Sequence, residues 1–422
     1  MARTLDVYLQ KDLVGHLIQD DGGQMVFDYG EGWLNRAGAC ALSQSLPLRR
    51  ERFTRKECRA FFAGVLPEES KREIIARNLG ISARNDYAML ERIGGECAGA
   101  VTFVPAGEPL PEQNYSYHPL TDEELATILE ELPKRPLLAG KQGVRLSLAG
   151  AQDKIAVRVD GKQVSLPLGG APSTHILKPG IERYEGVVFN EAFTMQLAAE
   201  IGLNVARVET RTVEGMSFLL VERYDRISNR TDTGESSVAR VHQEDFCQAL
   251  GVVPEMKYQK EGGPSLKQCF QLLREVSSAP VIDLARLLDA VIFNYMVGNN
   301  DAHGKNFSLL YPGAGTGDMQ VRLASLYDIV CTAYYPELSD EMAMKIGGEY
   351  LSRSVTVRGF EKFAEDAGLA KPLVRRRVME VAEKILAAAP KLDIENSVTE
   401  GVAALITGRV VKAVAHFRDR GD

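Results

Sequence analysis

The sequence predicts an α+β fold in which a β-rich lobe is followed by a helical lobe. Between residues 143 and 225, apolar and polar residues alternate in short runs around Asp-Gly and Glu-Gly pairs, a pattern typical of strands joined by tight turns. After Asp245 the apolar residues recur at helical spacing to the end of the chain, apart from NFSLLY, VRLASLYDIV and nearby loops. Strands and helices segregated in this way predict two lobes, with a cleft between them as the natural place for a ligand.

A smaller β-rich region precedes these two lobes. Residues 5–34 alternate around an Asp-Gly-Gly turn and predict a β-hairpin, while residues 54–66 and 69–78 predict helices. A stretch rich in Pro and Gly then marks a boundary near residue 110. The expected regions are an N-terminal β-rich subdomain (1–110), a β-rich lobe with a glycine loop (111–226) and a helical lobe (227–422).

The β-rich lobe contains the elements that the sequence predicts in most detail. Residues 121–132 predict a helix that begins with a capping box, Thr121 followed by Glu124. Residues 144–168 predict three strands, separated by a glycine-containing loop and by an Asp-Gly turn. Beyond them we expect a strand at 174–179, an amphipathic helix that ends at Gly202, and two strands at 206–226.

Composition limits the class of protein. The chain has 422 residues, with 50 Lys and Arg against 57 Asp and Glu, so its net charge is −7. A hydrophobic content of 45% argues against a disordered chain. No run approaches the roughly 18 apolar residues of a membrane-spanning helix, and the N-terminus lacks the apolar stretch of a signal peptide. We therefore expect a cytoplasmic protein that makes no membrane contact.

The acidic balance also argues against a protein that coats nucleic acid by itself, because such binding depends on neutralising phosphates. The acidic balance does not exclude a partner protein that binds DNA. The basic clusters at residues 49–59 and 375–377 could contact such a partner or DNA, although a solvated helix face is the commoner role of such clusters.

The cysteines are scattered, with no CxxC pair and no spacing typical of a zinc site. We expect them to be reduced and mostly buried, as small hydrophobic residues of a cytoplasmic protein. The six are Cys40, Cys58, Cys97, Cys247, Cys269 and Cys331.

The most informative segment is NYMVGNNDAHGKNFSLLY, residues 294–311. Asp301 and Asn306 form a DxxxxN pair in a loop rich in Gly and Asn, and Asp328 ends an apolar strand further along the chain. Phosphoryl transfer requires such a set of oxygens, because one Asp orients the attacking hydroxyl while an Asn and a second Asp hold Mg²⁺. Lys305, inside the loop beside His303, could neutralise charge on the transferred phosphoryl group. The segment therefore predicts a kinase.

Two other interpretations fit the same segment. Asp and Asn side chains often cap helices and turns, so the DxxxxN loop alone is a weak signal. A kinase of small molecules, of the aminoglycoside or choline type, has the same loop and a later Asp. That class does not account for the serine loop described below.

Upstream, Lys178 and Glu191 are candidates for nucleotide binding. Lys178 ends the strand-like segment THILK, much as the kinase lysine lies on a strand below the phosphate loop. Glu191, near the start of the next helix, is the candidate ion-pair partner that would orient this lysine. A solvated lysine at a strand end and a surface glutamate are the alternatives.

A loop of small residues lies between two predicted strands, where backbone N–H groups can approach phosphates closely. It has neither the Walker A pattern nor GxGxxG, so a plain hairpin turn fits it equally well. Ser147 falls on the polar face of its strand, immediately before the segment 148–154 that contains this loop. The loop residues are Ala149, Gly150, Ala151, Gln152, Asp153 and Lys154.

Glu222, Arg223 and Tyr224 close the β-rich lobe. In kinases the hinge that contacts adenine through backbone groups lies at this point of the chain. As a motif, these three residues are unspecific, so they do not identify a hinge by themselves.

Ten segments taken together resemble the HipA family, the serine/threonine kinase toxins of bacterial toxin–antitoxin modules. They occur in order from residue 45 to about residue 330, so the resemblance covers most of the chain. The segments are SLPL (45–48), FFAGVLPE (61–68), GAVTFVP (99–105), SLAGAQDK (147–154), THILK (174–178), ERYDR (222–226), QEDFCQALG (243–251), GGPS (262–265), DAHGKNFS (301–308) and LYDI (326–329).

The resemblance implies a two-lobed protein-kinase-like fold with an additional N-terminal β-rich subdomain, and a role for each matching residue. Asp301 looks like the catalytic Asp, and Asn306 and Asp328 look like the Mg²⁺ ligands. Ser147 looks like the autophosphorylated serine whose modification inactivates the toxin. The residues implied at the ATP site are Lys178, the phosphate loop 149–154, the hinge 222–224, His303, Gly304, Lys305, Asn306, Tyr327 and Asp328.

The resemblance also implies partners. In this family a small helix-turn-helix antitoxin, HipB, binds operator DNA and holds the kinase in a repressing complex. A family target is glutamyl-tRNA synthetase, whose phosphorylation stalls translation and causes growth arrest and persistence. The alternative to an active toxin is a catalytically silent kinase fold that acts as an antitoxin-dependent corepressor. The segment from Cys331 onward matches by pattern rather than by motif, so the target could differ.

Overall fold

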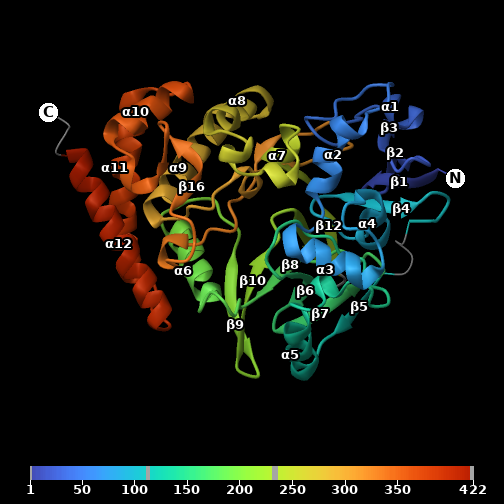
Figure 1. Cartoon of the computed structure of the whole chain (residues 1–422), viewed down its shortest axis with the longest axis horizontal. Helices are drawn as coiled ribbons and strands as arrows, with labels where there is room; N and C mark the ends of the chain where they lie inside the picture. Colours follow the sequence, from blue (N-terminus) through green and yellow to red (C-terminus); the bar gives the residue numbers. More distant parts are fainter. Residues whose placement is uncertain (1, 111–114, 231–235, 419–422) are drawn as a thin grey trace. The chain divides into compact units, whose positions relative to one another are not determined.

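The structure is a computed structural model that describes residues 2–110, 115–230 and 236–418 (Figure 1). The chain forms two compact units. The first comprises Met1–Pro179, Arg211–Glu255 and Leu309–Gln320, and the second comprises Gly180–Thr210, Met256–Ser308 and Val321–Asp422. The three regions expected from the sequence, with boundaries near residues 110 and 226, stay a prediction. Residues 111–114, beside the first boundary, lie outside the described part.

The first unit begins with a four-stranded antiparallel sheet in the order β3-β2-β1-β4. Leu5, Val7 and Leu9 alternate toward its buried face, as a strand period of two requires. The predicted Asp-Gly-Gly turn joins β2 and β3, and the Asp20 carboxylate accepts a hydrogen bond from the amide of Gln24 at 2.8 Å. The strands are β1 (Arg3–Leu9), β2 (Asp12–Gln19), β3 (Met25–Tyr29) and β4 (Val101–Pro105).

Four helices accompany this sheet, and two of them were predicted. Thr54 and Glu57 form a capping box at the start of α2, which places Phe61 and Phe62 in the core. The sequence did not predict α4, whose polar and apolar residues are interleaved within only eight positions. The helices are α1 (Glu31–Leu34), α2 (Arg55–Gly64), α3 (Glu69–Leu79) and α4 (Asp86–Ile93).

A six-stranded sheet in the order β5-β7-β6-β8-β10-β9 follows. The helix α5 (Asp122–Glu131) begins at the predicted capping box, where the amide of Glu124 donates to the Thr121 hydroxyl at 3.2 Å. The strand predicted before the glycine loop is wrong, because residues 144–148 form only an isolated bridge between Leu146 and Glu96. The strands are β5 (Ser116–Pro119), β6 (Ile155–Asp160), β7 (Gln163–Leu168), β8 (His175–Pro179), β9 (Val208–Val213) and β10 (Met216–Glu222).

Several short elements follow the second sheet. The sequence did not predict the hairpin β11–β12 or the hairpin β16–β17, which lies in the region predicted to be helical. The strands are β11 (Arg226–Arg230), β12 (Ser236–Arg240), β13 (His242–Asp245), β14 (Ser308–Tyr311), β15 (Arg322–Leu323), β16 (Glu341–Ile346) and β17 (Glu349–Leu351). Short helices are α7 (Phe246–Ala249) and the 3-10 turns η2 (Pro136–Leu138), η3 (Pro254–Met256), η4 (Gln259–Glu261), η5 (Gly304–Asn306), η6 (Thr332–Tyr334), η7 (Ser352–Ser354) and η8 (Ala389–Lys391).

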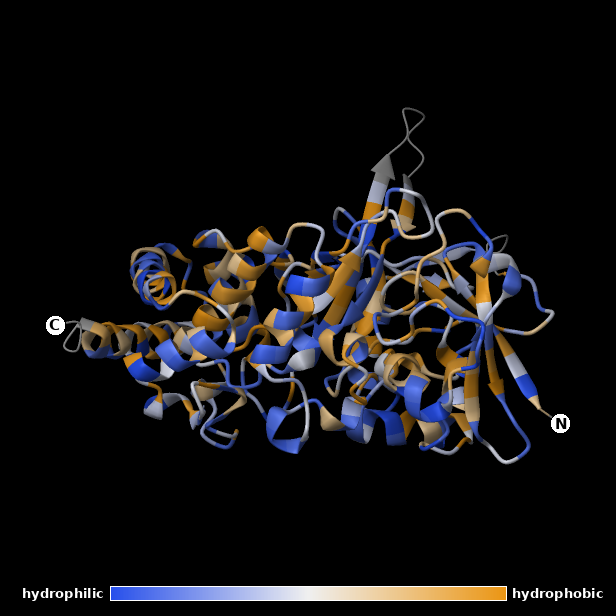
Figure 2. Ribbon diagram, turned by 90° about the horizontal axis from the view of Figure 1, so that it is seen from above, coloured by the Kyte–Doolittle hydropathy of each residue, from blue (hydrophilic) through white to orange (hydrophobic). Residues whose placement is uncertain are grey.

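The second unit is mainly helical, as predicted. The C-terminal helix α12 contacts α6, α9 and α11, and its buried residues Val402, Ile406 and Val410 recur once per turn. Figure 2 shows polar and apolar residues alternating around this helix. The helices are α6 (Val187–Glu200), α8 (Leu266–Val276), α9 (Pro280–Val297), α10 (Val357–Asp366), α11 (Lys371–Ala388) and α12 (Ser397–Arg418). The predicted α+β class is therefore confirmed.

The cysteines have the predicted state, since all six are buried and none forms a disulfide. Among the described residues, no helix is long and apolar enough to cross a membrane.

Glu244 is a fully buried carboxyl group in the first unit. It accepts hydrogen bonds from the Ser43 and Tyr311 hydroxyls and, at 2.9 Å, from the amide of Gln44. Burial outweighs these hydrogen bonds and raises the pKa of Glu244 to about 7. The folded state therefore holds this proton more tightly than the unfolded chain does.

We expect the free energy of unfolding to fall as pH rises from about 5 through 7, because the folded protein must then accept a buried negative charge. The loss should approach roughly 3 kcal/mol, from a pKa that rises from 4.5 to about 7. Urea unfolding at pH 5 and pH 8 measures this loss when the wild type is compared with Glu244→Gln, whose side chain does not titrate. The loss is the change between the two pH values in the difference between their free energies of unfolding. His242, whose pKa burial lowers to about 4, titrates in both proteins and cancels. Parallel pH dependence of the two proteins would contradict this account.

Candidate functional site

The predicted catalytic loop begins where α9 ends in the second unit. Gly298 ends this helix with φ of +76°, a left-handed conformation that favours glycine, and its amide donates to the backbone oxygen of Tyr295. The Asp301 carboxylate is exposed, and its Oδ1 accepts a hydrogen bond from the Tyr258 hydroxyl at 2.7 Å. Tyr258 could not be singled out from the sequence, since nothing in its local pattern separates it from a surface tyrosine.

Asn306 and Asp328 lie together in the same unit. The Asn306 side-chain nitrogen donates to Asp328 Oδ2 at 3.0 Å, while Asn306 Oδ1 accepts from the amide of His303 at 3.0 Å. Asn306 therefore caps its own turn, as the alternative interpretation expected, and it also contacts the later Asp. Asn306 and Asp328, which were predicted to act together, are thus in contact across 21 intervening positions.

Asp328 has an unusual backbone. Its φ is +58°, in the left-handed region where a residue other than Gly or Asn costs about 1–2 kcal/mol. Tyr327 holds the same segment, since its hydroxyl donates to the backbone oxygen of Lys305 at 2.6 Å. His303 and Lys305 are buried. Backbone strain of this kind is concentrated at functional sites, where the surrounding structure fixes it.

The Asn306–Asp328 pair fits a magnesium ion. Carboxylate and amide oxygens are the protein ligands that Mg²⁺ prefers, and it usually takes one or two of them together with water and phosphate oxygens. The strained backbone of Asp328 turns its carboxylate to within hydrogen-bond distance of the Asn306 amide. A rotation of that amide would present its oxygen beside the carboxylate.

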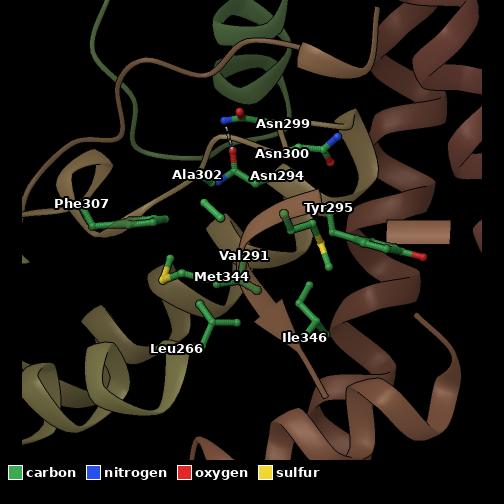
Figure 3. A pocket seen from close by; sticks show the side chains of 12 residues that line it. Leu266, Val291, Asn294, Tyr295, Asn299, Asn300, Ala302, Phe307, Met344 and Ile346 are labelled. Atoms are coloured by element: carbon green, nitrogen blue, oxygen red, sulfur yellow. Dashed lines mark hydrogen bonds between the residues drawn. The ribbon is translucent and has the colours of Figure 1, made fainter. Parts of the chain in front are cut away.

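A small cavity of about 30 Å³ lies beneath the catalytic loop (Figure 3). Figure 3 shows Asn294 from α9 bonded to Asn299, whose side chain donates to Asn294 Oδ1 at 2.7 Å. The cavity has room for about one water molecule and is therefore far too small for a nucleotide. Its lining includes Asn299, Asn300 and Ala302 of the loop itself.

In the first unit, Lys178 lies on β8, where it pairs with Leu219 of β10. Its side chain is only 6% exposed, which contradicts the alternative of a solvated lysine. Glu191 is also buried, in helix α6 of the second unit. An ion pair between these two residues stays a prediction.

The glycine loop is attached to the N-terminal part of the first unit. Gly150 pairs with Pro67 as a parallel bridge, and the amide of Glu68 donates to the Gly150 oxygen at 3.2 Å. Asp153 forms an ion pair with Lys71 at 2.6 Å. Within the loop, Lys154 donates to the backbone oxygen of Ala149 at 2.8 Å. Gly150 has a φ of +109°, which explains why a glycine is needed there.

Ser147 is completely buried just before this loop. Its hydroxyl donates to the backbone oxygen of Val65 at 2.8 Å, and its amide donates to the backbone oxygen of Glu96 at 2.9 Å. In this conformation the hydroxyl is inaccessible to another molecule.

The three predicted hinge residues have different surroundings. Glu222 is exposed at the end of β10, and the Tyr224 hydroxyl donates to the Gln243 side chain at 2.5 Å. The Arg223 amide donates to the backbone oxygen of Thr174 at 2.9 Å, so this amide is already bonded within the protein. The Arg223 guanidinium is buried and donates to Asp225 at 2.8 Å.

The structure thus brings the predicted residues together in two sets. The second unit holds the residues of the catalytic loop and of the later Asp, and the first unit holds the residues of the phosphate loop, the lysine and the hinge. Their combination into one site is part of the proposal below.

Comparisons with known proteins show the family of the chain. The sequence profile of the HipA N-terminal domain matches residues 5–104, and that of the HipA-like C-terminal domain matches residues 146–389. The Y4mE protein of Sinorhizobium fredii is 49% identical over 398 residues, which cover 93% of this chain and 92% of that protein. The serine/threonine-protein kinase toxin HipA of Shewanella oneidensis is 31% identical over 409 residues, covering 92% of this chain and 91% of that protein.

A solved structure shows the same fold. The structure of Shewanella oneidensis HipA with HipB and its operator DNA aligns with a TM-score of 0.84 and 28% identity, covering 99% of each chain. The predicted two-lobed kinase-like fold with an additional N-terminal β-rich subdomain is thereby confirmed. The chain belongs to the HipA family, the serine/threonine kinase toxins of toxin–antitoxin systems.

Proposed function

We propose that this protein is an ATP- and Mg²⁺-dependent protein serine/threonine kinase that acts as the toxin of a toxin–antitoxin module. The observation that carries the proposal is the second unit's catalytic loop, where Asn306 is bonded to Asp328 and the exposed Asp301 carboxylate has one oxygen held by Tyr258. Membership of the HipA family supports it, as does 31% identity to a kinase toxin of that name.

In the proposed reaction, the hydroxyl oxygen of a Ser or Thr side chain attacks the γ-phosphorus of ATP. The bond from that phosphorus to the bridging oxygen breaks, ADP leaves, and the hydroxyl proton passes to the Asp301 carboxylate. Asn306 and Asp328 would hold Mg²⁺, which when bound neutralises charge on the phosphate oxygens.

The first unit would supply most of the nucleotide contacts. Backbone amides of residues 149–154 and the ammonium of Lys178 would bind the phosphates, and backbone groups of residues 222–224 would bind adenine. Glu191 would orient Lys178 by an ion pair. His303, Gly304, Lys305 and Tyr327 would line the same nucleotide site.

Phosphorylation of Ser147 would inactivate the kinase. A phosphate carries a charge of about −1.5 to −2 at neutral pH, and the buried position of Ser147 offers it no solvation. The phosphorylated segment would therefore have to leave its contacts with Val65 and Glu96. The phosphate loop would move with it, since the loop begins two residues later.

The proposed partner is a HipB-like helix-turn-helix antitoxin, which would bind operator DNA and use this chain as a corepressor. The Shewanella oneidensis HipA structure, which contains HipB and operator DNA, supports this partner. The proposed target is a translation component, glutamyl-tRNA synthetase by family resemblance, in the cytoplasm. Its phosphorylation would cause growth arrest and persistence.

Intact mass after incubation with ATP and Mg²⁺ tests the proposal. We expect the wild type to gain one phosphate, and Ser147→Ala to gain none. Ser165→Ala, which removes another buried serine hydroxyl of the first unit, should gain the phosphate like the wild type. The mass before incubation shows whether phosphate is already present.

Two outcomes would count against parts of this proposal. Equal phosphate on the Ser147→Ala protein and the wild type would refute the modification site. If the wild type is unphosphorylated at the start and gains no phosphate, the result would count against kinase activity. It would favour the catalytically silent corepressor.

A further inference from the structure

Tyr258 is the side chain that contacts the proposed catalytic carboxylate. Its hydroxyl donates to Asp301 Oδ1 at 2.7 Å, a charge-assisted hydrogen bond. Its ring packs edge-on against the ring of His303, with centroids 5.3 Å apart. The Lys257 ammonium lies 5.5 Å from the centroid of the same ring. The phenol is therefore held in place rather than free to rotate into solvent.

A tight turn fixes the backbone of Tyr258. Its carbonyl oxygen accepts hydrogen bonds from the amides of Glu261 at 3.0 Å and Gly263 at 2.9 Å. A Cβ atom at position 263 would lie 2.3 Å from the backbone oxygen of Met256, so only glycine fits this turn. The turn thus fixes the backbone position from which the Tyr258 side chain extends.

The strand β16 connects this turn with the catalytic loop. The amide of Ala343 donates to the backbone oxygen of Asn300 at 2.7 Å, next to Asp301. Two residues on, the amide of Lys345 donates to the Gln259 side chain at 3.0 Å, next to Tyr258. One strand therefore fixes both ends of the Tyr258–Asp301 hydrogen bond relative to each other.

The two oxygens of the Asp301 carboxylate have different surroundings. Oδ1 accepts from Tyr258, whereas no group among the described residues bonds to Oδ2. A carboxylate that receives the proton of an incoming hydroxyl needs one oxygen open and its plane held at a fixed orientation. The geometry supplies both conditions.

We infer that Tyr258 is a positioning residue, whose hydroxyl holds Asp301 so that Oδ2 faces the Ser or Thr hydroxyl of the acceptor. This inference rests on the proposed kinase function. The tyrosine does not exchange a proton with the acceptor and acts only through Asp301.

Tyr258→Phe tests the inference, because it removes the hydroxyl and keeps the ring that packs against His303. The probe is a synthetic peptide of residues 141–154, which contains Ser147 as its only hydroxyl side chain, with dephosphorylated casein as a second acceptor. All proteins carry Ser147→Ala so that they do not label themselves. We expect kcat to fall about 10- to 100-fold, with KM for ATP and the dissociation constant of ATP unchanged within twofold.

Two controls separate positioning from a general structural role. Tyr350→Phe, another tyrosine of the same unit with no hydrogen bond to Asp301, should keep the kcat of the parent protein. In an Asp301→Asn background, Tyr258→Phe should add less than a twofold loss, because a residue that acts through Asp301 has nothing left to position.

Other results would overturn the inference. An unchanged kcat would show that the hydrogen bond has no role in catalysis. A raised kcat would show that the phenol blocks the place of the acceptor hydroxyl. Equal losses in kcat and ATP affinity, or a lowered unfolding temperature, would show a structural residue. Failure of the parent protein to phosphorylate either acceptor would instead refute the kinase function on which the inference rests.

Discussion

Asp301→Ala should lower the rate of phosphoryl transfer by about 10²- to 10⁴-fold, the range expected when a general base is removed. The exposed carboxylate is the only group of the DxxxxN loop that is both open to solvent and held by a neighbouring side chain. Its loss leaves the acceptor hydroxyl without a partner for its proton. Because Asp301 bonds neither Asn306 nor Asp328, nucleotide affinity should be retained.

Single-turnover transfer of the γ-phosphoryl group from ATP, followed by intact mass, measures this loss. Asp340→Ala is the matched control, because Asp340 is an exposed carboxylate of the same unit whose partner is Arg353. The control should transfer phosphate at the wild-type rate. Full activity of Asp301→Ala would mean that the catalytic residue has been assigned wrongly.

If Asp301→Ala lost nucleotide affinity together with activity, the role of Asp301 would be different. It would show that Asp301 contributes to nucleotide binding, in contrast to the separate surroundings of Asp301 and of the Asn306–Asp328 pair. Titration with a non-hydrolysable ATP analogue distinguishes the two outcomes. The catalytic and nucleotide-binding sets of residues are thereby tested independently.

The catalytic loop could be predicted from the sequence because its chemistry is local. Asp301 and Asn306 lie in one short loop whose apolar flanks fix its ends, and a later Asp after an apolar strand is a recognisable companion. The helix α5 was predicted for a similar reason, since Thr121 and Glu124 of its capping box are three positions apart. Interactions within a few residues leave a signature that a single sequence can show.

Contacts between distant segments left no such signature. Tyr258 reaches Asp301 across 43 positions, and its turn depends on a close approach at Gly263 that no spacing rule expresses. The segment 144–148 has the alternation of a strand but pairs only through an isolated bridge, because its amides and carbonyls bond to Glu96 and its neighbours. Tertiary contacts there override the local pattern.

Glu96 is the centre of a buried ionic cluster that the sequence also did not show. Its carboxylate receives hydrogen bonds from Arg226 at 2.8 Å and from Arg223 at 3.2 Å, and forms an ion pair with Arg240 at 2.6 Å. Burial alone would raise the pKa of Glu96, but these three guanidinium groups outweigh it and lower the pKa to about 2. Asp225 completes the cluster.

Glu96→Ala should lower the free energy of unfolding of the first unit by about 3–5 kcal/mol. Removing one partner of a buried ion pair leaves the opposite charge uncompensated. Without Glu96, Arg223 and Arg226 would share the carboxylate of Asp225, and Arg240 would lose its ion pair with Glu96. A loss of this size is a large part of the 5–15 kcal/mol that usually stabilises a folded domain.

Urea unfolding followed by Trp33 fluorescence measures this loss. The signal reports on the first unit, because Trp33 is the single tryptophan of the chain and is buried in that unit. Glu131→Ala is the matched control, since Glu131 forms a partly exposed ion pair with Arg135, four residues further along the chain. The control should cost no more than about 0.5 kcal/mol. If both substitutions shift the urea midpoint equally, the buried cluster contributes no more than a surface pair. A large shift for Glu96→Ala alone would show that this carboxylate holds the chain that follows β10, and with it the proposed adenine hinge, against the N-terminal part of the unit.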